Sequence, residues 1–267
     1  MTDAGTSRRE WNASAYHRLA NPHVTWGRRV LDRLPLRGDE TVVDAGCGSG
    51  RLTSELLLQL PQGRVLAIDQ SANMLAEARL HLEQLAPGRT TYLQADLQAL
   101  ILDAPVDAIF STAALHWVRD HQRMFTHFHA ALKPGGWLVA QCGGGPNIAS
   151  LVERARELMR SPRLAHNFDG WDGPWEFARA EETAARLAQA GFAEIETGLE
   201  AAPVTLANAA EYRDYLETVV FGSHLSRIPT APERAWFLDS LTEQAAADPQ
   251  PFLLDYWRLN MRARRPA

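Results

Sequence analysis

A ten-residue stretch near the start of the chain combines an acid with three closely spaced glycines. Residues 41–50 read Thr-Val-Val-Asp-Ala-Gly-Cys-Gly-Ser-Gly, so Asp44 stands two residues before the first glycine. Glycine tolerates positive φ and lets the backbone approach a ligand closely. A carboxylate beside such a loop favours a ligand with an ammonium group over a pyrophosphate. The dinucleotide fingerprint G-x-G-x-x-G is also broken, because Arg51 occupies its third glycine position.

Two further acids follow short apolar runs, as Asp44 does. Asp69 ends the run Arg64–Ile68, and Asp96 follows the run Thr90–Gln94. Runs of this composition favour buried strands. The carboxyl ends of parallel strands meet at one edge of a sheet, where Asp69 could accept hydrogen bonds from both ribose hydroxyls of a nucleotide. Three acids at the ends of successive strands therefore predict a nucleotide pocket at that edge.

The elements that would position these acids alternate along the chain, as they do in an α/β protein. The predicted strands are Thr41–Val43, Arg64–Ile68, Thr90–Gln94, Val106–Phe110, Trp137–Gln141, Phe192–Leu199 and Phe252–Met261, the last with the alternation of an edge strand. The predicted helices include Leu52–Leu60, Ala72–Leu85, Ile148–Met159 and Glu181–Ala190. A turn is predicted over Leu132–Gly136, directly before the fifth strand.

The pattern Asp-x-Gly-x-Gly-x-Gly resembles the signature of the class I S-adenosylmethionine-dependent methyltransferases. The resemblance implies a doubly wound, mostly parallel, seven-stranded Rossmann-like sheet whose last strand inserts antiparallel between the fifth and sixth. It implies that Asp44 and the loop hold the methionine part of S-adenosylmethionine, and that Asp96 and the N–H of Leu97 bind the adenine. The residues expected at this cofactor are Asp44, Gly46, Cys47, Gly48, Asp69, Gln70, Met74, Asp96, Leu97 and Ser111.

Three segments are similar to the trans-aconitate methyltransferase group, namely residues 11–16, 44–50 and 114–118. Juvenile hormone acid and malonyl-carrier-protein methyltransferases resemble the chain more distantly, and all of these enzymes methylate carboxylates. The resemblance therefore implies O-methylation of a small-molecule carboxylate, with S-adenosylhomocysteine as the second product. A carboxylate is ionised at neutral pH and needs no general base.

His116 is the candidate catalytic residue, since it follows the fourth predicted strand at the mouth of the pocket. It could donate a hydrogen bond to a substrate carboxylate, act as the base for a hydroxyl or carbon acceptor, or only hold its own loop. The other candidates for substrate contact could equally be packing residues. They are Trp11, Tyr16, Trp117, Trp171 and Tyr212.

Other histidines are weaker candidates. His121, His127 and His129 have no cysteine or carboxylate at metal spacing, so we expect surface residues and no metal site. His224 and Arg227 could offer charge to an acid, although solvent exposure is the simpler expectation for such a pair.

The predicted domain organisation is a Rossmann-like cofactor core over residues 1–146, completed by 176–206 and 249–267. Residues 147–175 and 207–248 are less regular, with aromatic loops and short helices. We expect these two excursions to form a helical lid inserted in the C-terminal half of the chain.

Composition limits the remaining possibilities. A net charge of −5 and a pI near 6.0 argue against a nucleic-acid partner. No apolar run has membrane-spanning length, and the polar N-terminal residues favour a cytoplasmic protein. Oligomeric state is left open. Two alternatives remain: an oxidoreductase, which Asp44 and the missing glycine oppose, and a non-catalytic protein that only binds S-adenosylmethionine.

Overall fold

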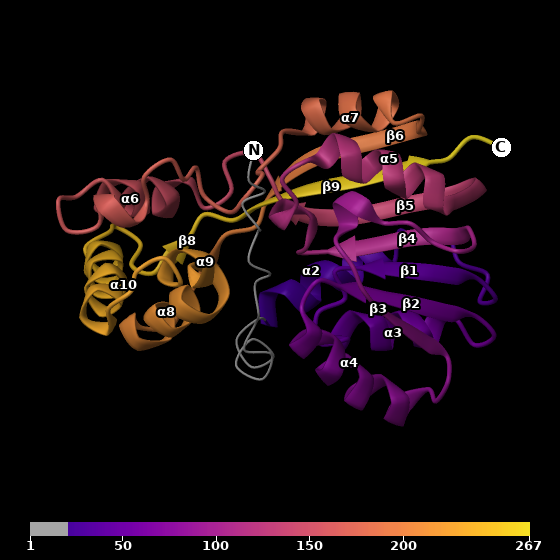
Figure 1. Ribbon diagram of the computed structural model, residues 1–267, viewed down its shortest axis with the longest axis horizontal. Helices are drawn as coiled ribbons and strands as arrows, with labels where there is room; N and C mark the ends of the chain where they lie inside the picture. The colour runs from indigo at the N-terminus through magenta and orange to yellow at the C-terminus, as the bar shows by residue number, and fades with distance from the viewer. Residues whose placement is uncertain (1–20) are drawn as a thin grey trace.

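The computed structural model describes residues 21–267, with side chains from residue 25 onward. Its centre is a seven-stranded sheet in the order β3-β2-β1-β4-β5-β9-β6 (Figure 1). Strand β9 pairs antiparallel with both β5 and β6, and the other pairings are parallel. This confirms the predicted doubly wound sheet and the insertion of its last strand. The strands are β1 (Thr41–Ala45), β2 (Arg64–Asp69), β3 (Thr90–Gln94), β4 (Val106–Thr112), β5 (Leu132–Gly143), β6 (Ala193–Ala201) and β9 (Trp257–Arg264).

Helices cover both faces of the sheet. Successive residues of a strand point to opposite faces, so a strand that is apolar throughout needs a covering layer on each face. Val42 packs in one core with helices α2 (Asn21–Leu31), α3 (Arg51–Gln59) and α4 (Ala72–Leu85). Its neighbour Val43 packs in a second core, on the other face. The helices of that face are α5 (His121–Ala131) and α7 (Ala180–Gln189), with the 3-10 turns η1 (Leu97–Ala99) and η2 (Leu115–Trp117) beside them.

A separate group of helices lies beside one end of the sheet, at the left of Figure 1. These helices have a hydrophobic core of their own, which includes Tyr215, Phe221 and Phe237. Two strands of two residues each, β7 (Val204–Thr205) and β8 (Leu253–Leu254), pair antiparallel in a small separate sheet. We call this group the cap: α6 (Ala149–Met159), α8 (Ala209–Tyr215), the π-helical turn η4 (Leu216–Val220), α9 (Gly222–Leu225) and α10 (Ala231–Ala246). A short 3-10 turn, η3 (Ala165–Asn167), follows α6.

Two sequence predictions about strands were wrong in part. The last strand of the sheet begins at Trp257, not Phe252, and it is an internal strand because β6 pairs with it. The alternation of residue types in this segment therefore reflects the different packing of the two faces of the strand. It does not mark an edge strand. Strand β5 already begins at Leu132, so the predicted turn over Leu132–Gly136 is a distorted strand start with Gly135 at φ 80°.

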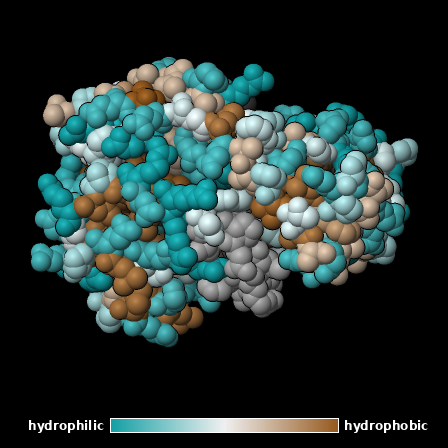
Figure 2. Space-filling model, turned by 180° about the vertical axis from the view of Figure 1, so that it is seen from behind, coloured by the Kyte–Doolittle hydropathy of each residue, from teal (hydrophilic) through white to brown (hydrophobic). Residues whose placement is uncertain are grey.

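The surface is mainly polar. Figure 2 shows hydrophilic residues over most of the face seen from behind, with hydrophobic residues in separate groups. The large apolar side chains that are exposed are Leu58, Leu80, Leu85 and Ile101. Among residues 21–267, the helices are too short or too polar to cross a bilayer.

Candidate active site

The glycine loop after β1 is held against the end of β2. The backbone N–H groups of Gly46 and Cys47 both donate to the carbonyl oxygen of Ile68, at 2.8 and 2.9 Å. A Cβ atom on Gly46 would lie 2.2 Å from the Cβ of Ala114, so packing requires glycine there. Gly48 differs, because at φ +53° it has no atom within 4 Å of a built Cβ. Gly48 is therefore the point where a ligand can approach the loop backbone.

Asp44 is a buried carboxylate under this loop, with 2% of its surface exposed. Its Oδ2 accepts a 2.7 Å hydrogen bond from the hydroxyl of Thr53 on α3. Burial raises the pKa of Asp44 to about 7, and the negative charge of Asp69 adds to the rise against the opposing Thr53 bond. A cationic ligand beside Asp44 would offset both effects, because an opposite charge favours the ionised form.

Asp69 and Asp96 lie at the carboxyl ends of β2 and β3, at the same edge of the sheet as Asp44. Asp69 accepts from the N–H of Gly48 at 3.0 Å through Oδ2 and from that of Ser71 at 2.9 Å through Oδ1. Asp96 is exposed and caps η1 by accepting from the N–H of Gln98. Both acids are therefore oriented by backbone donors.

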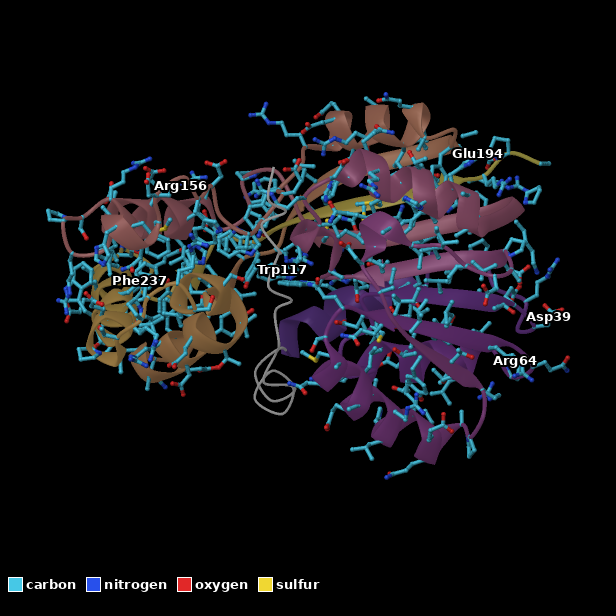
Figure 3. All side chains as sticks on the ribbon, in the orientation of Figure 1. Asp39, Arg64, Trp117, Arg156, Glu194 and Phe237 are labelled. Carbon is cyan, nitrogen blue, oxygen red and sulfur yellow. The ribbon has the colours of Figure 1, made fainter. Side chains whose placement is uncertain are left out.

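A pocket lies on the other side of the loop, between the sheet and the cap, where Figure 3 labels Trp117. Its empty volume is about 420 Å³, open solvent at the mouth included. Its described lining contains no Asp or Glu. The residues are Ala113, His116, Trp117, Asn147, Ile148, Trp175, Phe177, Val219, Val220, Tyr256 and Arg258.

His116 lies in this pocket wall with a defined tautomer. Its Nδ1 accepts a 3.3 Å hydrogen bond from the N–H of Gly143, at the end of β5. A neutral imidazole that accepts at one nitrogen carries its proton on the other. The ring is packed by Trp117 and Phe177, with ring centroids 5.1 and 5.9 Å away. The bond from Gly143 therefore assigns the proton of a neutral His116 to Nε2.

Arg258 is the charged residue among the pocket residues that the sequence analysis missed. It lies on β9 with 2% of its surface exposed, which is rare for an arginine. Its Nε donates to Gln141 Oε1 at 3.4 Å, and its guanidinium lies 4.7 Å from the ring centroid of Trp26. The available signal was a charged residue inside an apolar alternating strand. Arg258 gives the pocket a buried positive charge.

Backbone strain also gathers at this pocket. Four non-glycine residues of the described chain have positive φ, and Ala113 (53°) and Ile148 (46°) are both in the pocket lining. Such conformations cost free energy and persist where surrounding structure holds them, commonly at functional sites.

Comparisons with known proteins agree with this geometry. A family described as a methyltransferase domain matches residues 42–136. The trans-aconitate 2-methyltransferase of Azoarcus sp. is 36% identical over 180 residues, which are 67% of this chain and 60% of that protein. That of Deinococcus radiodurans is 32% identical over 86% of this chain and 87% of its own length. The chain belongs to the class I S-adenosylmethionine-dependent methyltransferases.

A solved structure is similar in fold. The phosphoethanolamine N-methyltransferase 2 of Haemonchus contortus, in complex with S-adenosylhomocysteine, superposes with a TM-score of 0.62 at 18% identity. The match covers 96% of this methyltransferase and 57% of that protein.

S-adenosylmethionine is the cofactor of this methyltransferase, and the loop geometry fits it. Gly48 leaves open space at the backbone, and buried Asp44 suits the ammonium of the methionine part. Four other predicted cofactor residues have visible structural roles. Ser111 is buried and donates to the carbonyl of Ala45, Cys47 is half-buried, and Met74 and Leu97 are buried. Gln70 is exposed, and its carbonyl accepts from Gln94 Nε2 at 3.0 Å. Their contacts with the cofactor stay predictions.

The predicted substrate contacts of the methyltransferase separate into three groups. Trp117 lines the pocket. Trp171 packs in the cap against Phe168, with ring centroids 5.5 Å apart, and Tyr212 is 1% exposed in the cap core against Phe252. Neither is among the residues that line this pocket, and their contact with a substrate stays a prediction. Trp11 and Tyr16 lie outside the described residues.

Two expectations of surface histidines were wrong. His121 is 1% exposed, and its Nε2 lies 2.9 Å from the carbonyl oxygen of Leu115. Burial lowers the pKa of His121 and keeps it neutral. His224 is 3% exposed within a group of aromatic rings, whereas Arg227 is exposed as expected. In both histidines, helix packing overrides the polar character of the side chain.

Proposed function

We propose that this methyltransferase transfers the methyl group to a carboxylate oxygen of a small acid held in the pocket by Arg258. The observation that supports this proposal is the guanidinium of Arg258, which is buried in the wall of this pocket. A guanidinium can bind a carboxylate through paired N–H donors, which supplies both charge and orientation. The relatives named trans-aconitate 2-methyltransferases support the same class of acceptor.

Methyl transfer to a carboxylate requires little of the protein beyond the positioning of the two reactants. S-adenosylmethionine supplies a methyl group that its sulfonium already activates. Arg258 can bind one oxygen of the acceptor carboxylate and leave the other as nucleophile, which orients it for in-line attack. The apolar walls around Arg258 exclude water and so strengthen this charge interaction.

His116 fits an orienting role in this scheme better than a basic one. Its Nδ1 is engaged by the N–H of Gly143, and Nε2 carries the proton in the neutral ring. A donor N–H can hydrogen-bond a carboxylate but cannot accept the proton of a hydroxyl. This favours carboxylate methylation over the alternative in which His116 activates a hydroxyl or carbon acceptor.

Substitution of Arg258 tests the proposal. Wild type and Arg258→Gln are compared on a panel of carboxylic acids and phenols, with trans-aconitate included, by S-adenosylhomocysteine release and methyl ester mass. We expect the substitution to lower kcat/KM for acids by at least about 30-fold, since it removes one partner of a buried charge pair.

The matched control is Arg262→Gln, four residues along the same strand but ion-paired at the surface with Glu196. It should leave kcat/KM within about 2-fold, because exposed ion pairs contribute little. S-adenosylhomocysteine affinity, measured by calorimetry, should be unchanged in both variants and shows that they fold. Equal turnover of acids by Arg258→Gln and wild type, or methylation of phenols alone, would contradict the proposal.

Three coarser predictions accompany this proposal. The cap acts as the predicted lid over the acceptor, the chain divides into core and lid at the predicted boundaries, and the acceptor is a small molecule in the cytoplasm, not a nucleic acid. The position of the pocket between sheet and cap supports the first of these.

A further inference from the structure

We propose that Gln141 is a positioning residue of the methyl transfer, whose side-chain amide holds the guanidinium of Arg258 in the orientation that binds the acceptor carboxylate. The inference rests on the proposed function, in which Arg258 binds that carboxylate, and it adds a residue that acts through Arg258. The orientation of the Gln141 amide is set in turn from strand β6, through Asn260 and Glu200.

Gln141 is a buried side chain on the same face of the sheet as Arg258. It lies on β5 and pairs with Asn260 of β9, the strand between β5 and β6 in Figure 1. Arg258 is two residues before Asn260 on β9. Directly paired residues share one face of a sheet, and so do residues two apart on a strand. Since Gln141 is 3% exposed and Arg258 2%, their contact is shielded from water.

The two hydrogen bonds of the Gln141 amide are directional. Nε2 of Gln141 donates to Oδ1 of Asn260 at 2.7 Å, and Oε1 of Gln141 accepts from Nε of Arg258 at 3.4 Å. A guanidinium has only donors, whereas an amide has a donor end and an acceptor end. An amide turned by half a rotation would place its own N–H groups against Arg258. Only one of the two orientations therefore supports the guanidinium.

Glu200 selects that orientation from the next strand. Its Oε2 accepts from Nδ2 of Asn260 at 3.4 Å. An ionised carboxylate only accepts, so the nitrogen of the Asn260 amide faces Glu200 and the oxygen faces Gln141. That oxygen requires the nitrogen of the Gln141 amide, which leaves Oε1 for Arg258. Orientation is thus passed through two amides, across β6, β9 and β5.

The end of β5 also fixes other parts of the pocket wall. The backbone carbonyl of Gln141 accepts from the N–H of Ala113 at 2.8 Å, and Ala113 is a pocket residue with positive φ. Gly143, two residues further along β5, donates to Nδ1 of His116. A misplacement of about 1 Å near a reacting group can lower a rate by about 100-fold, so support of Arg258 from this strand can determine kcat.

Two substitutions of Gln141 separate orientation from charge. Gln141→Met keeps a side chain of similar length without hydrogen bonds, and should lower kcat by at least about 10-fold. Gln141→Glu keeps an acceptor toward Arg258 but adds a charge that competes with the substrate carboxylate, so it should chiefly raise KM, by at least about 10-fold. General damage to packing would not divide kcat and KM between the variants in this way.

Both variants are assayed with the acid of the panel above that wild type methylates with the highest kcat/KM. S-adenosylmethionine is kept saturating, and S-adenosylhomocysteine release is measured. Calorimetry should give an unchanged S-adenosylhomocysteine affinity for both variants, which shows that they fold.

An exposed substitution tests the direction of the amides. Glu200→Lys replaces the acceptor by a donor, which reverses the amides of Asn260 and Gln141 and brings a donor against Nε of Arg258. We expect kcat to fall by at least about 3-fold, the loss of one modest hydrogen bond. Charge attraction alone predicts no loss, because the substitution adds positive charge on the side where an anionic acid binds.

The matched control is Glu196→Lys, the same change of charge on the same strand. The side chains of Glu196 and Glu200 are similarly exposed, at 59% and 50%, but Glu196 pairs with Arg33 and Arg262. It should leave kcat unchanged. In the Gln141→Met background, Glu200→Lys should add no further loss, because the amide that transmits its effect is gone.

The outcomes separate this inference from the proposed function. Unchanged kcat and KM in Gln141→Met, with acid turnover lost in Arg258→Gln, would overturn the inference and leave carboxylate methylation in place. Equal effects of Glu200→Lys and Glu196→Lys would also overturn it, and decide the matter if Gln141→Met does not bind S-adenosylhomocysteine. Absence of turnover on every acid would overturn the proposed function, and the inference with it.

Discussion

Cofactor binding should depend on pH through Asp44. Burial raises the pKa of this carboxyl to about 7 in the protein without ligand, so a large share is neutral near neutral pH. The ammonium of S-adenosylmethionine or S-adenosylhomocysteine favours the ionised form. Below pH 7, binding must therefore release a proton from Asp44, and this release weakens the apparent affinity.

The size of the effect follows from the pKa. If the ligand binds only ionised Asp44, the apparent dissociation constant is multiplied by 1 + 10^(pKa − pH). For a pKa of about 7 this factor is about 33 at pH 5.5 and about 2 at pH 7, so S-adenosylhomocysteine should bind about 16-fold more weakly at pH 5.5. This window lies below the titration of the ligand's own amino group.

Isothermal titration calorimetry measures both consequences. Dissociation constants are collected between about pH 5.5 and 7, and buffers of different ionisation enthalpy give the protons released, about 0.9 per ligand at pH 6. Asp44→Asn should bind weakly and without this pH dependence. Asp39→Asn is the control, since Asp39 is exposed and lies far from Trp117 in Figure 3. A constant wild-type affinity across this range would refute the assigned role of Asp44.

The same carboxyl predicts a stability effect. A pKa raised in the folded state stabilises the protein at low pH, and this contribution is lost as pH rises from about 4 through about 7. Because a shift from 3.8 to about 7 corresponds to at most about 4 kcal/mol, Asp44→Asn should unfold at higher temperature than wild type at pH 8 without cofactor. Equal unfolding temperatures for Asp44→Asn and wild type would show that burial of the ionised Asp44 carboxylate does not destabilise the protein.

Three further predictions concern the cofactor, the acceptor and the cap. Asp69→Ala should weaken S-adenosylhomocysteine binding by about 1.5–3 kcal/mol in calorimetry, because it removes a charged acceptor from two ribose hydroxyls. For an acid substrate at saturating cofactor, kcat should be nearly flat from about pH 6.5 to 9, and His116→Asn should lower it by about 10-fold or less. A pH slope that disappears in His116→Asn would instead identify a general base. Amide exchange in 166–175 and 207–228 should slow when S-adenosylhomocysteine and an acid are added together, and equal exchange would exclude a gate.

The cofactor half of the molecule could be predicted from sequence because its signals are local. Helix α4 and strand β3 have the predicted bounds, since Ser71 caps the helix by accepting from the N–H of Met74. Asp44, Asp69 and Asp96 stand where the pattern places them, because each follows an apolar strand of only a few residues. Glycines and acids at such positions can be recognised from their neighbours in the sequence, without knowledge of distant segments.

Arg258 could not be predicted in this way, because its environment comes from long-range pairing. Its strand is inserted between β5 and β6, which brings Gln141 and Trp26 to its guanidinium from 117 and 232 positions earlier in the chain. A single arginine in an alternating segment is usually a solvent-facing residue. Here the register between β5 and β9, which pairs Gln141 with Asn260, places it in the interior instead.

The division between cofactor and acceptor residues also explains what the comparisons decide. The matched methyltransferase domain, residues 42–136, contains Asp44, Asp69 and Asp96 and therefore the predicted methyl donor site. It ends before most of the pocket lining, which comes from Asn147, Ile148, Trp175, Phe177, Val219, Val220, Tyr256 and Arg258. These segments lie in or beside the cap, whose fold is specified by its own core. Replacement of cap side chains can therefore change the acceptor without disturbing cofactor binding, so similarity in the donor half does not determine which acceptor is methylated.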